Sequence, residues 1–343
     1  MPDPMSRRTA LAGLGALGAA LLAGCSGGSP GPAGGTLLPA SDSGTGTAAS
    51  DPPSPTPSPT PDVTVTTVTG PVTVPGGATR VVTLDTAELD SAMTLGITPV
   101  GAAKAPLDAG LPDYWPASRL AQVAVVGDIG AAPDAARIAA TRPQLILSNQ
   151  TRDGGHDGTL RALAPTVLTP TTGYPWKDGF QLHAAALDRR EQAAAVTGAY
   201  ARHIDQATRA INGAGAGGKR ISIVRFVEGE APTIRLYGRQ SFIGTVLADL
   251  GLGRPDSQNA DRPDTGITPD QLAQADGDYL FHATYGDPVR SGAAAVLAST
   301  AWQGLGAVRA HRAFPVDDQL WFQGIGYTGA NLLVAELQRA LGA

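Results

Sequence analysis

The hydrophobic pattern of residues 63–180 alternates between strands and helices. Segments with apolar side chains at helical spacing lie between short runs of β-branched and aliphatic residues, and Thr86 can begin the first helix. Strands that alternate with helices along a chain form a parallel sheet covered by helices. We therefore expect an N-terminal α/β lobe over 63–180, with strands at 80–84, 97–101, 123–126, 145–148 and 166–168 and helices at 86–95, 133–140 and 160–163.

A helical pattern without interruption follows at residues 181–213. Its apolar side chains recur every three or four residues and so share one face: Val196, Tyr200, His203, Ile204, Ala207 and Ile211. Gly213 and the glycines after it end the pattern. A helix of about 30 residues would be roughly 45 Å long, which suits a rigid connection between two lobes.

Residues 214–343 repeat the alternation of strands and helices. Strand patterns occur at 220–227, 233–237, 279–282 and 310–314, and helical patterns at 241–250, 269–275, 293–305 and 329–341. Because the 281 residues from 63 onward exceed a usual single core, two units are expected. The predicted fold class is α/β, with two Rossmann-like lobes joined by a single long backbone helix.

The beginning of the chain indicates export. Arg7 and Arg8 precede an uncharged run that is too short to span a bilayer and that ends at Leu22-Ala23-Gly24-Cys25, which resembles a bacterial lipobox. We expect residues 1–24 to be a signal peptide and Cys25, the only cysteine, to be lipidated. A secretory signal that happens to contain a cysteine is the alternative. The twin arginines leave the Sec and the twin-arginine export routes both open.

The segment after the lipobox has the composition of a tether. Of the 37 residues in 26–62, 28 are Gly, Pro, Ser or Thr, so this stretch has too few apolar side chains to form a core. We expect residues 25–62 to be a lipidated cysteine and a disordered tether. The folded lobes would then lie at the outer face of the cytoplasmic membrane.

Charge and motifs exclude several functions. The net charge of −5 gives no basic surface for nucleic acid, and one cysteine excludes an intramolecular disulfide. The chain has no Gly-x-Ser-x-Gly, His-Glu-x-x-His or Gly-x-x-x-x-Gly-Lys motif, and its five histidines are dispersed. We therefore predict no enzyme, no metal site and no bound cofactor.

Five segments, in order along 79–343, carry a family resemblance. They are Leu95-Gly96-Ile97-Thr98-Pro99-Val100-Gly101, Arg142-Pro143-Gln144-Leu145-Ile146, Leu250-Gly251-Leu252-Gly253, Ala275-Asp276-Gly277-Asp278-Tyr279 and Trp302-Gln303-Gly304-Leu305-Gly306-Ala307-Val308. Together they resemble the iron–siderophore and cobalamin class of ABC-transporter substrate-binding proteins. The resemblance implies a ligand cleft between the lobes, a monomer, and delivery of the ligand to a membrane permease with its ATPase.

The ligand that we expect is a ferric siderophore, of the hydroxamate type. Receptors for cobalamin or haem in the same class, and a surface sensor lipoprotein without a transport role, are the alternatives. A ferric hydroxamate is bulky and neutral or singly positive, so it needs aromatic walls and one or two arginine donors. On strand position, loop position and resemblance, the candidate ligand-binding residues are Arg225, Trp321, Tyr285, Tyr237, Trp176, Tyr174, Asn149 and Thr86; for the two tryptophans, packing in the core is the competing interpretation.

The resemblance also implies permease docking through one acidic residue on each lobe. Asp270 matches this position in the C-terminal lobe. In the N-terminal lobe Ala136 stands where the family has Glu, so Asp134, or else Asp128, is the candidate there. This departure leaves open whether docking is symmetrical.

Overall fold

The computed structural model describes residues 60–229 and 233–343. The predicted signal peptide, the lipidation site Cys25 and almost all of the tether lie outside the described residues. The described part begins with an antiparallel hairpin that the sequence pattern did not indicate, formed by β1 (Val63–Thr67) and β2 (Gly70–Val74). The hairpin adds Val65, Val72 and Val74 to the core of the N-terminal lobe.

The N-terminal lobe is the predicted parallel sheet with helices on it. Its five strands are in the order β5-β4-β3-β6-β7, and every neighbouring pair is parallel. Strand β6, between β3 and β7, is buried along its whole length, as its mainly aliphatic sequence favours. The elements are β3 (Val81–Thr83), α1 (Thr86–Thr94), β4 (Gly101–Lys104), α2 (Ala117–Leu120), β5 (Ala124–Asp128), α3 (Ala135–Ala140), β6 (Leu145–Asn149), α4 (Gln150–Asp153), α5 (Asp157–Arg161) and β7 (Thr166–Thr169), with a 3-10 turn at Gly154–His156.

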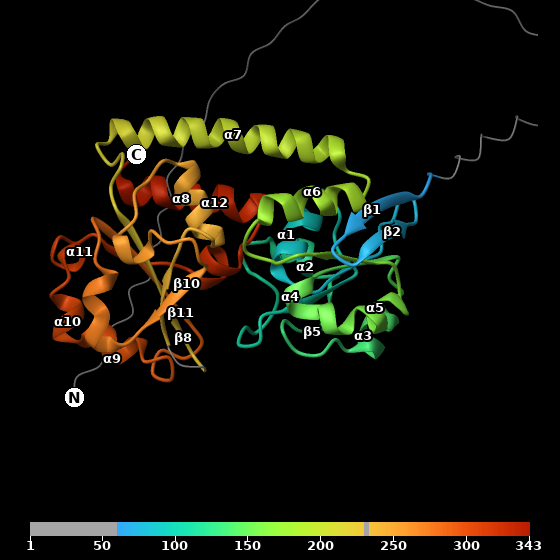
Figure 1. Cartoon of the computed structure of the whole chain (residues 1–343), viewed down its shortest axis with the longest axis horizontal. Helices are drawn as coiled ribbons and strands as arrows, with labels where there is room; N and C mark the ends of the chain where they lie inside the picture. The colour runs from blue at the N-terminus through green and yellow to red at the C-terminus, as the bar shows by residue number, and fades with distance from the viewer. Residues whose placement is uncertain (1–59, 230–232) are drawn as a thin grey trace, which may run out of the picture. The chain divides into compact units, whose positions relative to one another are not determined.

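The predicted helix over 181–213 is two helices in the structure. Helix α6 (Trp176–Ala186) ends two residues before Asp188, whose φ of 54° is left-handed, and α7 (Arg190–Gly213) begins two residues after it. The amides of Leu187 and Arg189 close the end of α6 on the carbonyls of His183 and Ala184. Helix α7 still runs along both lobes (Figure 1). Its buried face is Ala193, Tyr200, Ile204, Ala207 and Ile211.

The C-terminal lobe is a mixed five-stranded sheet in the order β10-β9-β8-β11-β12. Strands β8, β11 and β12 are parallel, whereas β9 and β10 are antiparallel to their neighbours. Residues 228–233 alone separate β8 from β9 in the sequence, whereas a parallel crossover needs about a dozen residues or more. The elements are β8 (Ile221–Val227), β9 (Ile234–Tyr237), α8 (Phe242–Asp249), β10 (Asp264–Ile267), β11 (Tyr279–Tyr285), α9 (Ala293–Ala298), α10 (Thr300–Gln303), α11 (Gly306–Arg309), β12 (Ala313–Pro315) and α12 (Tyr327–Leu341), with 3-10 helices at Asp256–Gln258 and Pro269–Ala275 and a π-helical turn at Gln319–Gln323.

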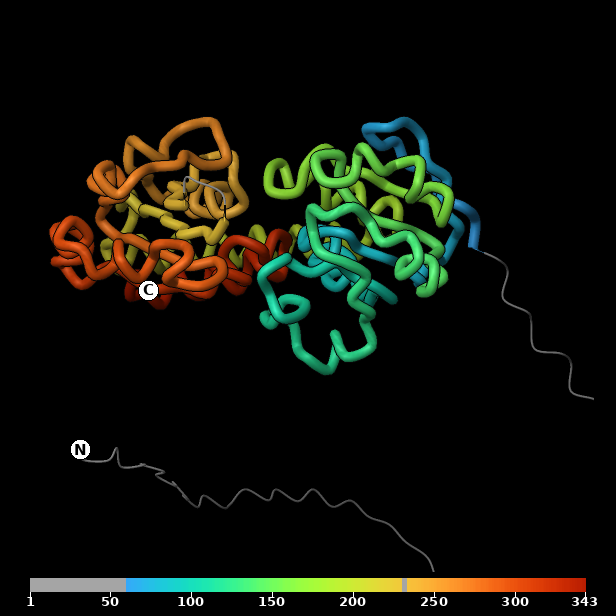
Figure 2. The backbone as a smooth tube through the Cα atoms, turned by 90° about the horizontal axis from the view of Figure 1, so that it is seen from below, coloured from blue at the N-terminus to red at the C-terminus, as the bar shows by residue number. Residues whose placement is uncertain are grey.

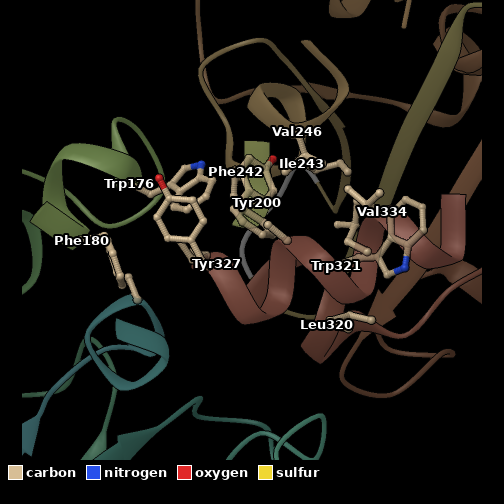
Figure 3. Packing of buried hydrophobic residues seen from close by; sticks show 14 of the residues in the cluster. Trp176, Phe180, Tyr200, Phe242, Ile243, Val246, Leu320, Trp321, Tyr327 and Val334 are labelled. Carbon is tan, nitrogen blue, oxygen red and sulfur yellow. The ribbon is translucent and has the colours of Figure 1, made fainter. Parts of the chain in front are cut away.

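The two lobes share one hydrophobic core under α7. Tyr327, the first residue of α12, packs against Trp176, Phe180 and Tyr200 with ring-centroid distances of 4.9, 4.7 and 5.2 Å (Figure 3). Trp176 and Phe180 come from α6 beside the N-terminal lobe, and Phe242 of α8 closes the cluster on the other side at 5.5 Å from Trp176. Figure 2 shows the two lobes side by side.

Polar contacts also join the lobes at this junction. The buried carboxylate of Asp90 in α1 accepts hydrogen bonds from the amides of Thr328 and Gly329 at the start of α12. The Lys177 ammonium contacts both carboxylate oxygens of Asp249 in α8, at 2.8 and 2.6 Å.

Within 60–229 and 233–343, no helix has the length and apolar composition of a membrane span.

Candidate ligand-binding cleft

Two adjoining cavities lie between the lobes. One of about 610 Å³ and one of about 270 Å³ are both lined by Arg152 and Thr172 of the N-terminal lobe and by Arg225, Phe322 and Ile325 of the C-terminal lobe. They form where the strands of both sheets end, the edge at which α/β folds bind ligands. We call the two together the cleft.

A larger groove of about 720 Å³ lies beside the cleft and is lined by carboxylates rather than by aromatic rings. Asp108 and Asp113 enter it from the loop after β4, and Glu228, Asp287 and Asp317 from the C-terminal lobe. Of the eight predicted ligand residues, none lines this groove, whereas seven line the cleft or a third cavity of about 390 Å³ that includes Tyr174 and Trp176. The cleft is therefore the candidate site.

Arg225 lies at the centre of the cleft wall, as predicted, but its donors are already engaged. Its Nε and Nη2 atoms donate to the two carboxylate oxygens of Asp318, both at 2.7 Å, and Nη1 donates to the Tyr237 hydroxyl at 3.2 Å. The rings of Tyr285 and Phe322 lie 4.8 and 4.9 Å from its guanidinium carbon. Only 14% of the side chain is exposed, so the ligand would meet a paired arginine.

Three aromatic rings surround this arginine. Tyr237 on β9 packs edge-on against Phe322 at 4.7 Å. The hydroxyl of Tyr285, at the end of β11, accepts a hydrogen bond from the Leu107 amide at 3.0 Å, which ties the loop after β4 to the C-terminal lobe. Tyr237 and Tyr285 thus stand on the cleft wall where the sequence placed them, and their contact with ligand stays a prediction.

Arg152 is a cleft residue that the sequence reasoning missed. It follows β6 in α4, and its Nε donates to the buried carboxylate of Asp85 at 3.1 Å. Its side chain is 41% exposed and lines both parts of the cleft. The sequence does contain a signal for Arg152, because the polar run from Ser148 to Arg152 follows a buried strand. From this run, Asn149 alone is among the predicted ligand residues.

A buried polar network lies behind Arg152. Asn149, which is fully buried, donates to Asp85 at 3.2 Å and to Glu88 at 3.4 Å, and its side-chain oxygen caps α4 through the Arg152 amide. Burial, and then the nearby Asp85, raises the pKa of Glu88 to about 8. Glu88 is therefore protonated at neutral pH, which limits the charge repulsion among these carboxyl groups.

The structure places Asn149 within this network, and its predicted ligand contact stays a prediction. The side chain of Asn149 is sealed inside the lobe, where it holds Asp85 and the start of α4. Thr86 follows β3 and borders the cleft, although only 4% of the residue is exposed. The helix that it was expected to cap is capped by Asp85 instead, with Thr86 as the first helical residue.

Both predicted tryptophans are largely buried, and their contact with ligand stays a prediction. Trp321 has no exposed surface, stacks on Phe281 at 4.8 Å and donates to Glu336 at 2.6 Å. The π-helical turn directs Trp321 into the core and Phe322, the next residue, towards Arg225. Trp176 is 4% exposed and donates to Thr245 at 2.7 Å, so it belongs to the junction between the lobes rather than to the cleft wall.

Tyr174 is placed as a ligand contact would require. Its side chain is 43% exposed, and it stands in the loop before α6 between the cleft and a further cavity of about 390 Å³. The peptide bond between Tyr174 and Pro175 is cis. Thr171 donates its hydroxyl to the Tyr174 carbonyl.

The two predicted docking residues are both on the surface. Asp270 is exposed at the start of the 3-10 helix Pro269–Ala275, and hydrogen bonds from Thr268 and its own amide keep its pKa below the usual value. Asp134 is exposed but occupied, since it caps α3 through the Arg137 amide at 3.0 Å and pairs with the Arg137 guanidinium at 3.2 Å. Asp128 pairs with Lys104 at 2.9 Å.

The side chains of 60–229 and 233–343 include no cluster of three or more His, Cys, Asp or Glu that could hold a metal ion. What the cleft can do is hold a bulky ligand. It offers aromatic edges, three arginines (Arg152, Arg225 and Arg235) and hydroxyl or amide groups from Thr151, Thr171, Gln240 and Ser241.

Comparison with known proteins agrees with this arrangement. In sequence, the chain is similar to the "Probable siderophore-binding lipoprotein YfiY" of Bacillus subtilis (strain 168), with 29% identity over 278 residues that cover 77% of this chain and 83% of that protein. It is also similar to the achromobactin-binding periplasmic protein of Dickeya dadantii (strain 3937), with 25% identity over 77% of this chain and 86% of that protein.

Solved structures match the fold. Staphylococcus aureus SirA complexed with staphyloferrin B superposes with a TM-score of 0.73 at 23% identity, covering 81% of this chain and 98% of that one. Bacillus subtilis FeuA, a triscatecholate siderophore binding protein complexed with ferri-bacillibactin, superposes with a TM-score of 0.68 at 17% identity over 81% and 98%.

The family model described as "Periplasmic binding protein" matches residues 81–320, which include both sheets, α7 and most of the cleft. Members of this family are substrate-binding transport proteins. The match to this family implies an architecture of two lobes with parallel strands, joined by a long helix, with a cleft at the strand ends; α7 is that helix here. The chain belongs to the periplasmic binding protein family, in its iron–siderophore and cobalamin class.

Proposed function

We propose that this protein is an extracytoplasmic receptor of an ABC importer that captures a ferric siderophore and delivers it to a membrane permease. The observation that carries the proposal is the cleft, in which Arg225, Tyr237, Tyr285 and Phe322 form one wall opposite Arg152. The names of its sequence relatives support the ligand class, since two of the proteins that it resembles are named for siderophore or achromobactin binding.

The ligand type that we propose is a hydroxamate chelate. A ferric tris-hydroxamate is neutral, because three singly charged groups balance Fe³⁺, and its carbon arms need apolar walls. The rings around Arg225 and the exposed Tyr174 supply such walls, and aromatic faces also suit a singly positive chelate. In this proposal the contacts are Arg225, Tyr237, Tyr285, Tyr174 and Thr86, with Arg152 and Phe322 added by the structure.

A titration of the folded protein with ferrichrome and ferrioxamine tests this function. We expect saturable binding, a rise in melting temperature, and quenching of tryptophan emission, because Trp321 is adjacent to Phe322 on the cleft wall. Cobalamin, haem and a ferric tris-catecholate serve as competitors. Binding of cobalamin or haem alone would replace the siderophore with that ligand, and no binding to any of them would overturn a receptor function.

We further propose that Cys25 carries a lipid anchor and that Asp270 and Asp134 face the permease. The names of two relatives as lipoproteins support the anchor. The Cys25→Ala protein should leave the membrane fraction and enter the culture fluid, and its retention in the membrane would contradict the anchor.

Because Asp134 is held by Arg137 and Asp270 is free of ion pairs among the described residues, we expect Asp270→Ala to reduce uptake more than Asp134→Ala.

A further inference from the structure

Asp318 forms an ion pair with the arginine at the centre of the cleft wall. Arg225 is the arginine nearest the aromatic wall, and Asp318 takes two of its donors in a bidentate ion pair at 2.7 Å. The exposed fractions of the two side chains are 14% and 10%. Water therefore screens this pair poorly, and its net charge towards the cleft is close to zero.

The rest of the cleft is balanced in the same way. Among the described residues that line the cleft, the positively charged side chains are Arg152, Arg225 and Arg235. The negatively charged ones are Asp85 and Asp264. Asp85 is paired with Arg152 at 3.1 Å. With Asp318 included, three arginines face three carboxylates, so the cleft as a whole is neutral.

The neighbouring groove strengthens the bias against anions. Asp108, Asp113, Glu228, Asp287 and Asp317 line it beside Asp318, with Arg290 as the arginine among its described lining residues. Arg290 is already paired with Glu228, at 2.5 Å. A multiply charged anion in the cleft would lie next to these carboxylates, and no excess of arginine would compensate the repulsion.

We propose that Asp318 is a specificity-determining residue, which keeps the cleft neutral by holding Arg225 and thereby selects neutral or singly positive ferric chelates over multiply anionic ones. This inference rests on the proposed siderophore function. Asp318 acts through Arg225 and does not itself line the cleft. Its replacement should therefore change the ratio of affinities for two chelates of different charge.

The test compares ferrichrome, which is neutral, with ferri-bacillibactin, whose three catecholates give the complex a charge of −3. Dissociation constants are measured at fixed salt by calorimetry. The wild-type protein should prefer ferrichrome by at least about tenfold, and Asp318→Asn should shift this ratio by about tenfold towards the anion, because it adds one positive charge near the ligand.

Three variants control the interpretation. The double variant R225Q/D318N keeps the cleft neutral. Because Arg225 is a proposed contact, both affinities should fall, but their ratio should stay within about threefold of the wild-type ratio. Asp278→Asn adds the same charge at a partly exposed ion pair with Arg220, outside the residues that line the cleft, and should leave the ratio unchanged. Asp264→Asn adds a charge to the cleft at a partly exposed position, and it tests the same prediction if D318N does not fold.

The outcomes separate the two claims. A wild-type protein that binds neither chelate overturns the proposed function and this inference with it. A wild-type protein that binds the tris-catecholate more tightly, or a D318N protein with the wild-type ratio (D264N where D318N is unfolded), overturns the role of Asp318 and leaves the receptor function standing. Shifts in D318N and D264N together with an unchanged double variant support the inference.

Discussion

His183 in α6 is a titratable side chain that the fold holds without a hydrogen bond. It is 1% exposed, and neither ring nitrogen has a partner among the described residues. Burial lowers its pKa from 6.5 to about 3, since the charged ring would lose its water. The unfolded chain therefore takes up a proton below pH 6.5 that the folded protein takes up only near pH 3.

This difference predicts a pH-dependent gain from His183→Leu. Above pH 6.5 His183 is neutral in both the folded and the unfolded chain, so it adds no pH dependence. Below pH 6.5 the unfolded chain binds the extra proton, and the free energy of unfolding falls by about 1.4 kcal/mol per pH unit. Between pH 7.5 and pH 5, the stability advantage of H183L over wild type should grow by about 2 kcal/mol. Urea unfolding at both pH values measures it. A stability advantage of H183L that is the same at both pH values would contradict this effect of burial.

Phe322 is the residue whose loss should affect binding most directly. Its ring lies against both Arg225 and Tyr237, at 4.9 and 4.7 Å. We expect Phe322→Ala to weaken binding of ferrichrome roughly tenfold, since it removes a central aromatic contact. Trp176→Phe should lower the melting temperature and change the affinity by less than about twofold. Equal losses of affinity in the two variants would place the ligand at the junction instead.

For single residues, the sequence could identify which types of side chain lie near the cleft, but not the direction in which each side chain points. Trp321 and Phe322 are consecutive aromatic residues, and only the π-helical turn decides that Trp321 enters the core and Phe322 the cleft. Asn149 follows a strand as ligand residues often do, yet its position opposite Asp85 and Glu88 makes it a structural residue. The contacts of Asn149 join residues 61 and 64 positions apart, which no local pattern records.

Among the elements, the start of α12 has the tightest steric requirement. Gly326 precedes this helix, and a Cβ atom added there would overlap the Oδ1 atom of Asp90, the carboxylate that caps α12 from the other lobe. Burial raises the pKa of Asp90 to about 6, although four hydrogen bonds to the carboxylate oppose this rise. A methyl group at 326 must therefore displace a buried polar group.

Gly326→Ala should destabilise the protein by about 1–3 kcal/mol, the usual cost of overpacking a core. Gly213→Ala is the matched control, because nothing lies within 4 Å of an added Cβ there and alanine favours helix by up to about 1 kcal/mol. Thermal melts of both variants give the comparison. A G326A protein as stable as wild type would mean that the Asp90 contact does not hold α12.

Helices and strands were more predictable than their ends. The strand patterns at 145–148 and 220–227 correspond to β6 and β8 within one residue, because aliphatic runs in buried parallel strands are unambiguous. The break between α6 and α7 was missed since Asp188, not Gly, adopts the left-handed conformation there. The hairpin β1–β2 was missed because its threonine-rich strands follow directly on the tether.

For the whole molecule, two α/β lobes and a long connecting helix followed from the order of the patterns, and the family match confirms that architecture. The antiparallel strands β9 and β10 depart from the predicted parallel order: residues 228–233 alone join β8 to β9, and a parallel crossover needs about a dozen residues or more. The charge of the cleft could not be predicted, because it depends on Arg225 and Asp318, which are 93 positions apart.

The continuous core under α7 has a consequence for how the protein denatures. One cluster of buried side chains includes Leu145 of the first sheet, Ile223 and Phe281 of the second, and Tyr327 between them. Neither lobe can therefore lose its structure without exposing apolar surface of the other, and the two should unfold in a single cooperative step. Calorimetry should show one transition with equal van't Hoff and calorimetric enthalpies, and a bound chelate should move that whole transition upward without splitting it.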